Sequence, residues 1–166
     1  MEALSFYAEL MDTLRDKLNI SVVIVTLNRA MMLEDLLASL TRQTRIPDEV
    51  VVVDNGSTDN TREIAENFRS GLNIKYVLEK RKGIPIARNT GVQNSTGEVI
   101  VFTDDDCIAD KEWLHYLELP FLRDHSIGMV GGEILAQRSK GTLVEEYCIA
   151  DALMRVGFKF KKEAAP

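Results

Sequence analysis

Short runs of β-branched residues alternate with longer segments of helical period along most of this chain. The Val- and Ile-rich runs predict strands over residues 20–26, 49–54, 73–78, 97–103 and 127–135. Apolar residues at helical spacing predict helices over residues 61–70, 85–94, 111–123 and 142–156, and a first domain helix that Asn28 caps. The strand runs lack in-and-out alternation, which is typical of strands covered on both faces. The repeated strand–helix–strand order therefore predicts an α/β fold, a Rossmann-like, mostly parallel sheet with helices on both faces.

Residues 1–19 also carry apolar side chains at helical spacing, from Leu4 to Leu18. We expect an amphipathic helix here that packs against the domain or a partner chain. Its polar face mixes both charge signs, which disfavours a role on a membrane surface. The predicted organisation is this helix, a single domain over residues 20–156, and a short, charged, frayed tail over residues 157–166.

Composition narrows the class of protein. The chain has 166 residues, of which 45% are hydrophobic and 28% are charged, as in one ordinary globular domain. Its net charge of −6 disfavours nucleic-acid binding, which needs a basic face. Two cysteines are too few for a disulfide scaffold, so we expect a reducing, cytoplasmic location, with peripheral membrane association left open. No apolar run reaches the length of a membrane span.

Polar residues follow several predicted strands at the point where each strand ends. Thr26, Asn28 and Arg29 follow the first strand, Asp54 closes the second, and three consecutive aspartates close the fourth. Ligands of open parallel sheets bind beyond the carboxyl ends of the strands. The sequence therefore predicts a binding site at this edge of the sheet.

The three aspartates, Asp104, Asp105 and Asp106, carry the sharpest chemistry. Adjacent carboxylates repel one another unless a cation neutralises them, and oxygen ligands select Mg²⁺ or Mn²⁺. Alternation along an extended segment predicts that Asp104 and Asp106 share a face while Asp105 turns aside. A solvated acidic turn, or the cap of the helix that follows, is the alternative interpretation.

Further candidates lie near the same edge. Asp54 can accept hydrogen bonds from a nucleobase or ribose. The composition of residues 55–59 predicts a turn in which Asp59 caps the next helix. Lys82, within the basic run 80–82, either neutralises phosphate or lies in a solvated loop, and Arg88 suits a pyrophosphate. Gly91 allows close packing of helix and strand. Glu133 is a weak candidate for a catalytic carboxylate.

The runs ISVVIVTLNR, EVVVVDNGSTDNT and GIPIARNTGVQNSTGEVIVFTDDDC resemble the nucleotide-binding half of family 2 glycosyltransferases, over about residues 20–132. The resemblance implies the GT-A fold and a nucleotide-diphospho-sugar donor. It places Thr26, Asn28, Arg29 and Arg88 beside the nucleotide and Asp54 at the base. Asp104 and Asp106 match the outer positions of the DxD motif, which binds ribose and the metal on the diphosphate, and Asp105 takes the middle position.

The implied activity is inverting transfer of a sugar, UDP being the commoner nucleotide, to an unknown glycan, lipid or protein acceptor. A divalent ion would stabilise the leaving nucleoside diphosphate. The family's acidic pair is not found after Asp106. The alternative hypothesis is therefore a truncated or non-catalytic module that binds a nucleotide-sugar without a catalytic base. The apolar face of residues 1–18 also suggests a homodimer. Two other families of α/β proteins with acidic sites, receiver domains and dehalogenase-like phosphatases, are disfavoured because they place their aspartates after other strands.

Overall fold

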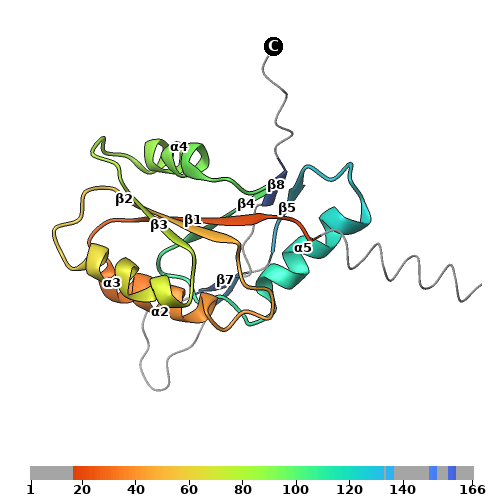
Figure 1. Ribbon diagram of the computed structural model, residues 1–166, viewed down its shortest axis with the longest axis horizontal. Helices are drawn as coiled ribbons and strands as arrows, with labels where there is room; N and C mark the ends of the chain where they lie inside the picture. Colours follow the sequence, from red (N-terminus) through yellow and green to blue (C-terminus); the bar gives the residue numbers. More distant parts are fainter. Residues whose placement is uncertain (1–16, 133, 137–149, 153–156, 160–166) are drawn as a thin grey trace, which may run out of the picture.

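The computed structural model describes residues 17–132, 134–136, 150–152 and 157–159. A six-stranded sheet runs through the centre of the molecule in the order β3-β2-β1-β4-β8-β5 (Figure 1). Its first four strands in chain order are β1 (Ile20–Thr26), β2 (Glu49–Asp54), β3 (Ile74–Leu78) and β4 (Val99–Asp104). The two others are β5 (Met129–Val130) and β8 (Gly157–Lys159). The strands β6 (Ile134–Ala136) and β7 (Ala150–Ala152) form a separate antiparallel pair.

Parallel pairing of the four long strands confirms the predicted sheet. The strand β1 lies between β2 and β4, and β3 extends the sheet beyond β2. The register places Thr26 opposite Asp54, and Val25 opposite Asp104. The polar residues that close three strands therefore meet at one edge, as the sequence predicts.

Helices cover both faces of this sheet. The helices α2 (Ala30–Leu40), α3 (Thr61–Asn67) and α5 (Trp113–Arg123) lie on one side, and α4 (Ile84–Asn94) lies on the other (Figure 1). A short 3₁₀ turn, η1 (Phe68–Ser70), continues α3. In β1, Val22 packs into the core under α2 and α5, while its neighbour Val23 packs under α4. Both positions are buried, which explains the continuous apolar runs.

The helix α4 packs very closely on the sheet because Gly91 faces it. A β-carbon at Gly91 would lie 2.3 Å from Cγ1 of Val23 and 3.3 Å from Cγ2 of Val53. This confirms the predicted structural role of the glycine. The close approach brings the start of α4, with Arg88, over the carboxyl edge of the sheet.

Three of the predicted elements are wrong where the structure describes them. Residues 150–152 form β7 rather than part of a helix over residues 142–156. Residues 157–159 of the predicted frayed tail form β8, which pairs antiparallel with β4 and with β5. The strand predicted over residues 127–135 is divided between β5 and β6, which belong to different sheets. These pairings join residues far apart in the chain, so the local pattern of apolar and polar residues cannot predict them.

The predicted N-terminal helix is also wrong at its end, since residues 17–19 are not helical. The backbone of Leu18 is instead held by two buried side chains of the domain. Its N–H donates to Glu118 (3.1 Å), and its carbonyl accepts from Arg45. Residues 1–16 lie outside the described residues. Among the helices that the structure describes, none combines the length and apolar character needed to cross a bilayer.

Candidate functional site at the carboxyl edge of the sheet

An open pocket of about 500 Å³ lies at the carboxyl ends of β1, β2 and β4, beneath the start of α4. Its polar lining combines two arginines with three carboxylates. The lining residues are Val25, Thr26, Leu27, Arg29, Asn55, Ile84, Arg88, Asp104, Asp105 and Asp106. Six of the predicted site residues, with Asp105 among them, are therefore brought together. Asn28, Asp54 and Lys82 lie beside this pocket, outside its lining.

The loop between β1 and α2 is shaped by Asn28. This residue has a left-handed backbone (φ +56°), which asparagine tolerates better than most residues. Its side-chain oxygen accepts from the N–H of Thr58 (2.7 Å), and its own N–H donates to Oγ of Ser57 (2.8 Å). Asn28 therefore ties the loop after β1 to the loop after β2.

The start of α2 differs from the prediction that Asn28 caps this helix. Arg29 occupies the N-cap position, and its side chain makes no capping hydrogen bond. A carboxylate oxygen of Asp59 accepts from the N–H of Ala30 (3.1 Å), while the other accepts from the N–H of Thr61 (3.1 Å). Asp59 thus serves the first turns of two helices, although the sequence predicts only the second.

Arg29 pairs with two of the carboxylates that line the pocket. Its Nη1 lies 3.1 Å from a carboxylate oxygen of Asp105 and 3.2 Å from one of Asp106. Burial raises the pKa of Asp105, and the Thr26 hydroxyl and Arg29 counteract this effect only in part. The negative charge of Asp105 in turn raises the pKa of Arg29. The guanidinium is therefore the counter-ion of a buried carboxylate.

The three aspartates are arranged differently from the predicted alternation. Asp104 pairs with Nη2 of Arg88 (3.0 Å), whereas Asp105 and Asp106 share Arg29. Extended backbone ends at Asp104, and the chain turns over the next two residues, so a period of two no longer applies there. The side chains of Asp104 and Asp106 are 64% and 44% exposed, which leaves both accessible to a ligand in the pocket.

Asp54 is engaged within the protein. One carboxylate oxygen accepts from the N–H groups of Gly56 (3.0 Å) and Ser57 (2.7 Å), and the other accepts from the hydroxyl of Tyr76. Burial, together with this hydrogen bond, raises the pKa of Tyr76. A carboxylate has about four acceptor positions, so little of the capacity of Asp54 remains for a nucleobase. No motif in the sequence singles out Tyr76.

Asn55 holds the loop between β3 and α4 in place. Its side-chain nitrogen donates to the carbonyls of Glu79 (2.9 Å) and Arg81 (2.8 Å), and its side-chain oxygen accepts from the N–H of Gly83 (2.9 Å). The ammonium of Lys82 donates to the backbone carbonyl of Asn55 (2.9 Å). Lys82 therefore links the loop between β3 and α4 to the loop after β2. The sequence allowed either a phosphate contact or a solvated position for this residue.

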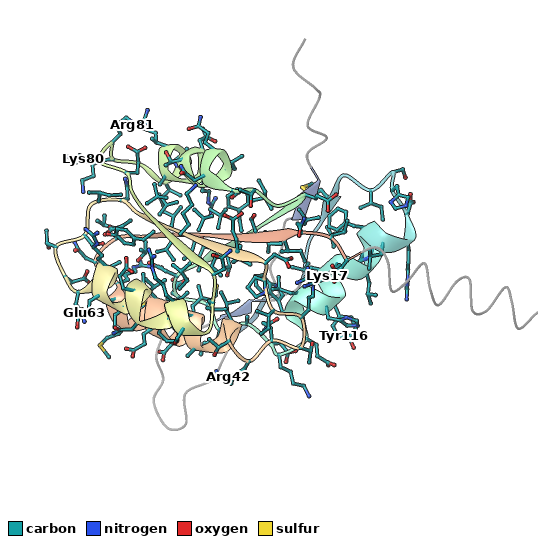
Figure 2. The ribbon with its side chains drawn as sticks, viewed as in Figure 1. Lys17, Arg42, Glu63, Lys80, Arg81 and Tyr116 are labelled. Carbon is teal, nitrogen blue, oxygen red and sulfur yellow. The ribbon has the colours of Figure 1, made fainter. Side chains whose placement is uncertain are left out.

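The same loop carries two further basic residues, Lys80 and Arg81, both labelled in Figure 2. Arg81 pairs with the buried carboxylate of Glu79, which also accepts from the hydroxyl of Thr90 (2.6 Å). Hydrogen bonds from Arg81, and then from Thr90, lower the pKa of Glu79 to about 2. Arg81 is thus held within the loop, and Glu79 is a structural residue that no sequence motif marks.

The donor chemistry of the pocket fits one mode of metal binding. Mg²⁺ usually takes one or two protein carboxylates together with waters and substrate phosphates. The exposed carboxylates of Asp104 and Asp106 provide such oxygen ligands. In the part of the chain that the structure describes, no group of three or more His, Cys, Asp or Glu side chains could hold a metal ion. The residues therefore suit a cation shared with a phosphate-bearing ligand and do not form a closed protein cage.

One predicted site residue is not among those that the structure describes, and two other residues are buried. Glu133 lies outside the described residues. Cys107 is buried, and burial raises the pKa of its thiol, as expected for an unreactive cysteine. Trp113, the first residue of α5, is fully buried in the core.

Comparison with known proteins gives a consistent result. The family model described as Glycosyl transferase family 2 matches residues 21–151. Glycosyltransferase AglE of Haloferax volcanii is 35% identical over 133 residues, which are 77% of this chain and 43% of that protein.

Solved structures show the same fold. TarS of S. aureus (residues 1–349) superposes with a TM-score of 0.66 at 31% identity, covering 75% of this chain and 38% of that one. It has also been solved in complex with UDP-GlcNAc. The mannosyltransferase PcManGT from Pyrobaculum calidifontis, in complex with GDP-Man and Mn²⁺, gives a TM-score of 0.63 at 28% identity, over 78% of this chain and 42% of that one. The chain spans less than half the length of each of these proteins.

Proposed function

The chain belongs to glycosyl transferase family 2 and has the GT-A fold, and we propose that it forms the donor-binding part of a metal-dependent, inverting glycosyltransferase. The donor would be a nucleotide-diphospho-sugar, and the acceptor a hydroxyl of an unknown glycan, lipid or protein. One observation carries this proposal: the loop after β1, the helix α4 and the end of β4 bring two arginines and three consecutive carboxylates to one open pocket at the carboxyl edge of the sheet. Transferase names among the relatives favour catalysis over binding alone.

Arg29 and Arg88 would bind the diphosphate of the donor. Guanidinium groups match phosphate oxygens with two parallel hydrogen bonds, and both side chains are about half exposed in the pocket. Asp54 would contact the nucleobase only through the acceptor position left by its own turn. Asn28 and Lys82 would act by holding the loops that surround the nucleotide. We propose a uridine nucleotide first, with guanosine as the competing base, since related structures contain UDP-GlcNAc and GDP-Man.

Asp106, together with Asp104, would hold a Mn²⁺ or Mg²⁺ ion. When bound, such an ion acts as a Lewis acid that stabilises negative charge on the departing diphosphate. Asp105 would keep Arg29 in the pocket through their ion pair. Inversion requires the acceptor hydroxyl to attack from the face opposite the diphosphate, assisted by a carboxylate base. The described residues supply no assigned base, and Glu133 remains a prediction.

Calorimetric titration with UDP and GDP, each with and without Mn²⁺, tests the donor site. We expect micromolar binding of one nucleotide that requires the metal in the wild-type protein and is lost in Asp106→Asn. Asp35→Asn, an exposed carboxylate on α2 outside the pocket, is the matched control and should bind as the wild type does. Failure of both nucleotides to bind, with the metal present, would overturn the proposed donor site.

Hydrolysis or transfer of the sugar then separates catalysis from binding alone. We expect slow release of UDP from a UDP-sugar in the presence of Mn²⁺, measured by a coupled assay. Tight binding without any release of UDP, for UDP-sugars and GDP-sugars alike and with acceptors supplied, would favour the module that only binds. Light scattering tests the proposed homodimer, which a monomeric mass at high concentration would exclude.

A further inference from the structure

Arg29 has two properties that the donor site alone does not require. A single guanidinium nitrogen bridges Asp105 and Asp106, so the arginine already neutralises the carboxylate proposed to hold the metal. Asp105 is only 4% exposed, whereas Arg29 is half exposed. The arginine therefore joins a buried charge to an accessible one.

The backbone beneath Arg29 is held firmly on both sides. Asn28 is fixed by its hydrogen bonds to the loop after β2, and Ala30 is fixed by Asp59. The side chain of Arg29 is long and reaches from this fixed backbone into the open pocket. A change of partner by the guanidinium therefore needs side-chain rotation and no movement of α2.

A divalent ion at Asp106 would compete with the guanidinium of Arg29 for the carboxylate oxygen that Arg29 contacts. A diphosphate offers Arg29 another anionic partner, and Arg88, paired with Asp104, lies in the same pocket. We infer that Arg29 exchanges partners during donor binding: it occupies one carboxylate oxygen of Asp106 in the free protein and turns to the diphosphate when nucleotide and cation bind together. Arg29 would thereby couple the binding of the two ligands, so that neither binds well alone. This inference rests on the proposed donor site.

The test measures the affinity for Mn²⁺ alone and at saturating UDP, or GDP if that is the nucleotide bound, by calorimetry. The ratio of the two dissociation constants is the coupling factor, which measures how far each ligand favours binding of the other. In Arg29→Gln, we expect Mn²⁺ alone to bind about twofold to fivefold more tightly, because a half-exposed ion pair is worth roughly this factor. We expect the coupling factor to fall by about the same amount.

A matched control lies at the other end of the same helix. Arg42 is exposed just after α2, far from the pocket, and is labelled in Figure 2. Arg42→Gln removes the same charge and should leave the coupling factor at the wild-type value. Arg29→Lys keeps the charge but loses the fork, and should give an intermediate coupling factor. This variant also serves if Arg29→Gln unfolds, since it leaves Asp105 with a cation.

The outcomes separate this inference from the proposed function. Nucleotide binding that depends on metal, with the same coupling factor in wild type, Arg29→Gln and Arg29→Lys, would refute partner exchange and leave the donor site intact. Absence of nucleotide binding in the wild type would instead refute the donor site itself. Tighter binding of Mn²⁺ to Arg29→Gln with an unchanged coupling factor would show that Arg29 only repels the cation and does not couple the two ligands. This outcome also contradicts the inference.

Discussion

Replacing Gly91 by alanine tests the close contact between α4 and the sheet. The added methyl group would lie 2.3 Å from Cγ1 of Val23, well inside van der Waals contact, and 3.3 Å from Cγ2 of Val53. Val23 is 1% exposed and β-branched, so it has few other rotamers to adopt within the strand. The helix must therefore move away from the sheet.

Two opposing effects determine how much Gly91→Ala changes the free energy of unfolding. Alanine is favoured over glycine within a helix by about 1 kcal/mol. Overpacking a buried site costs about 1–3 kcal/mol, and the short distance at Val23 places Gly91 at the upper end of this range. We therefore expect Gly91→Ala to lower the free energy of unfolding by about 1–2 kcal/mol. The shift of α4 should also disturb the pair between Arg88 and Asp104, three residues earlier on the helix.

Urea denaturation followed by the fluorescence of Trp113, the single tryptophan, measures this change. Gly128→Ala is the control, since nothing lies within 4 Å of a β-carbon there, and it should change stability little. In a Val23→Ala background the clash disappears, so Gly91→Ala should cost less there than in the wild type. A Gly91→Ala protein as stable as the wild type, or more stable, would refute the packing argument.

Two further predictions concern buried charges. Arg45→Met leaves the buried carboxylate of Glu118 without its cation and should lower the free energy of unfolding by about 3 kcal/mol. Arg69→Met breaks only a half-exposed pair and should cost less than about 1 kcal/mol, so equal effects in urea denaturation would contradict this reasoning. The pKa of Glu79 is lowered from 4.5 to about 2, so its contribution to stability is complete above pH 4.5 and is lost as the pH falls toward 2. Thermal unfolding between pH 2 and 6 should therefore be less pH-dependent in Glu79→Gln than in the wild type, and parallel curves would show that Glu79 does not contribute.

The site shows where prediction from sequence succeeds and where it stops. The residues that line the pocket were predictable because parallel strands end at one edge, which places Thr26 and the aspartates together. Their partners were not predictable. Asp54 is a conspicuous polar residue in the sequence, yet Tyr76, 22 residues away, and two N–H groups of its own turn occupy most of its oxygens.

The sequence by itself determined the parallel α/β core of this protein, because continuous Val and Ile runs record burial on both faces of each strand. It also determined which edge of the sheet carries polar chemistry. Only the tertiary structure decided the pairing of β8 with β4 and the sharing of Arg29 by Asp105 and Asp106. The physical reason is the same in both cases: these contacts join residues remote in the chain, and the residues that flank each partner leave no local trace of them.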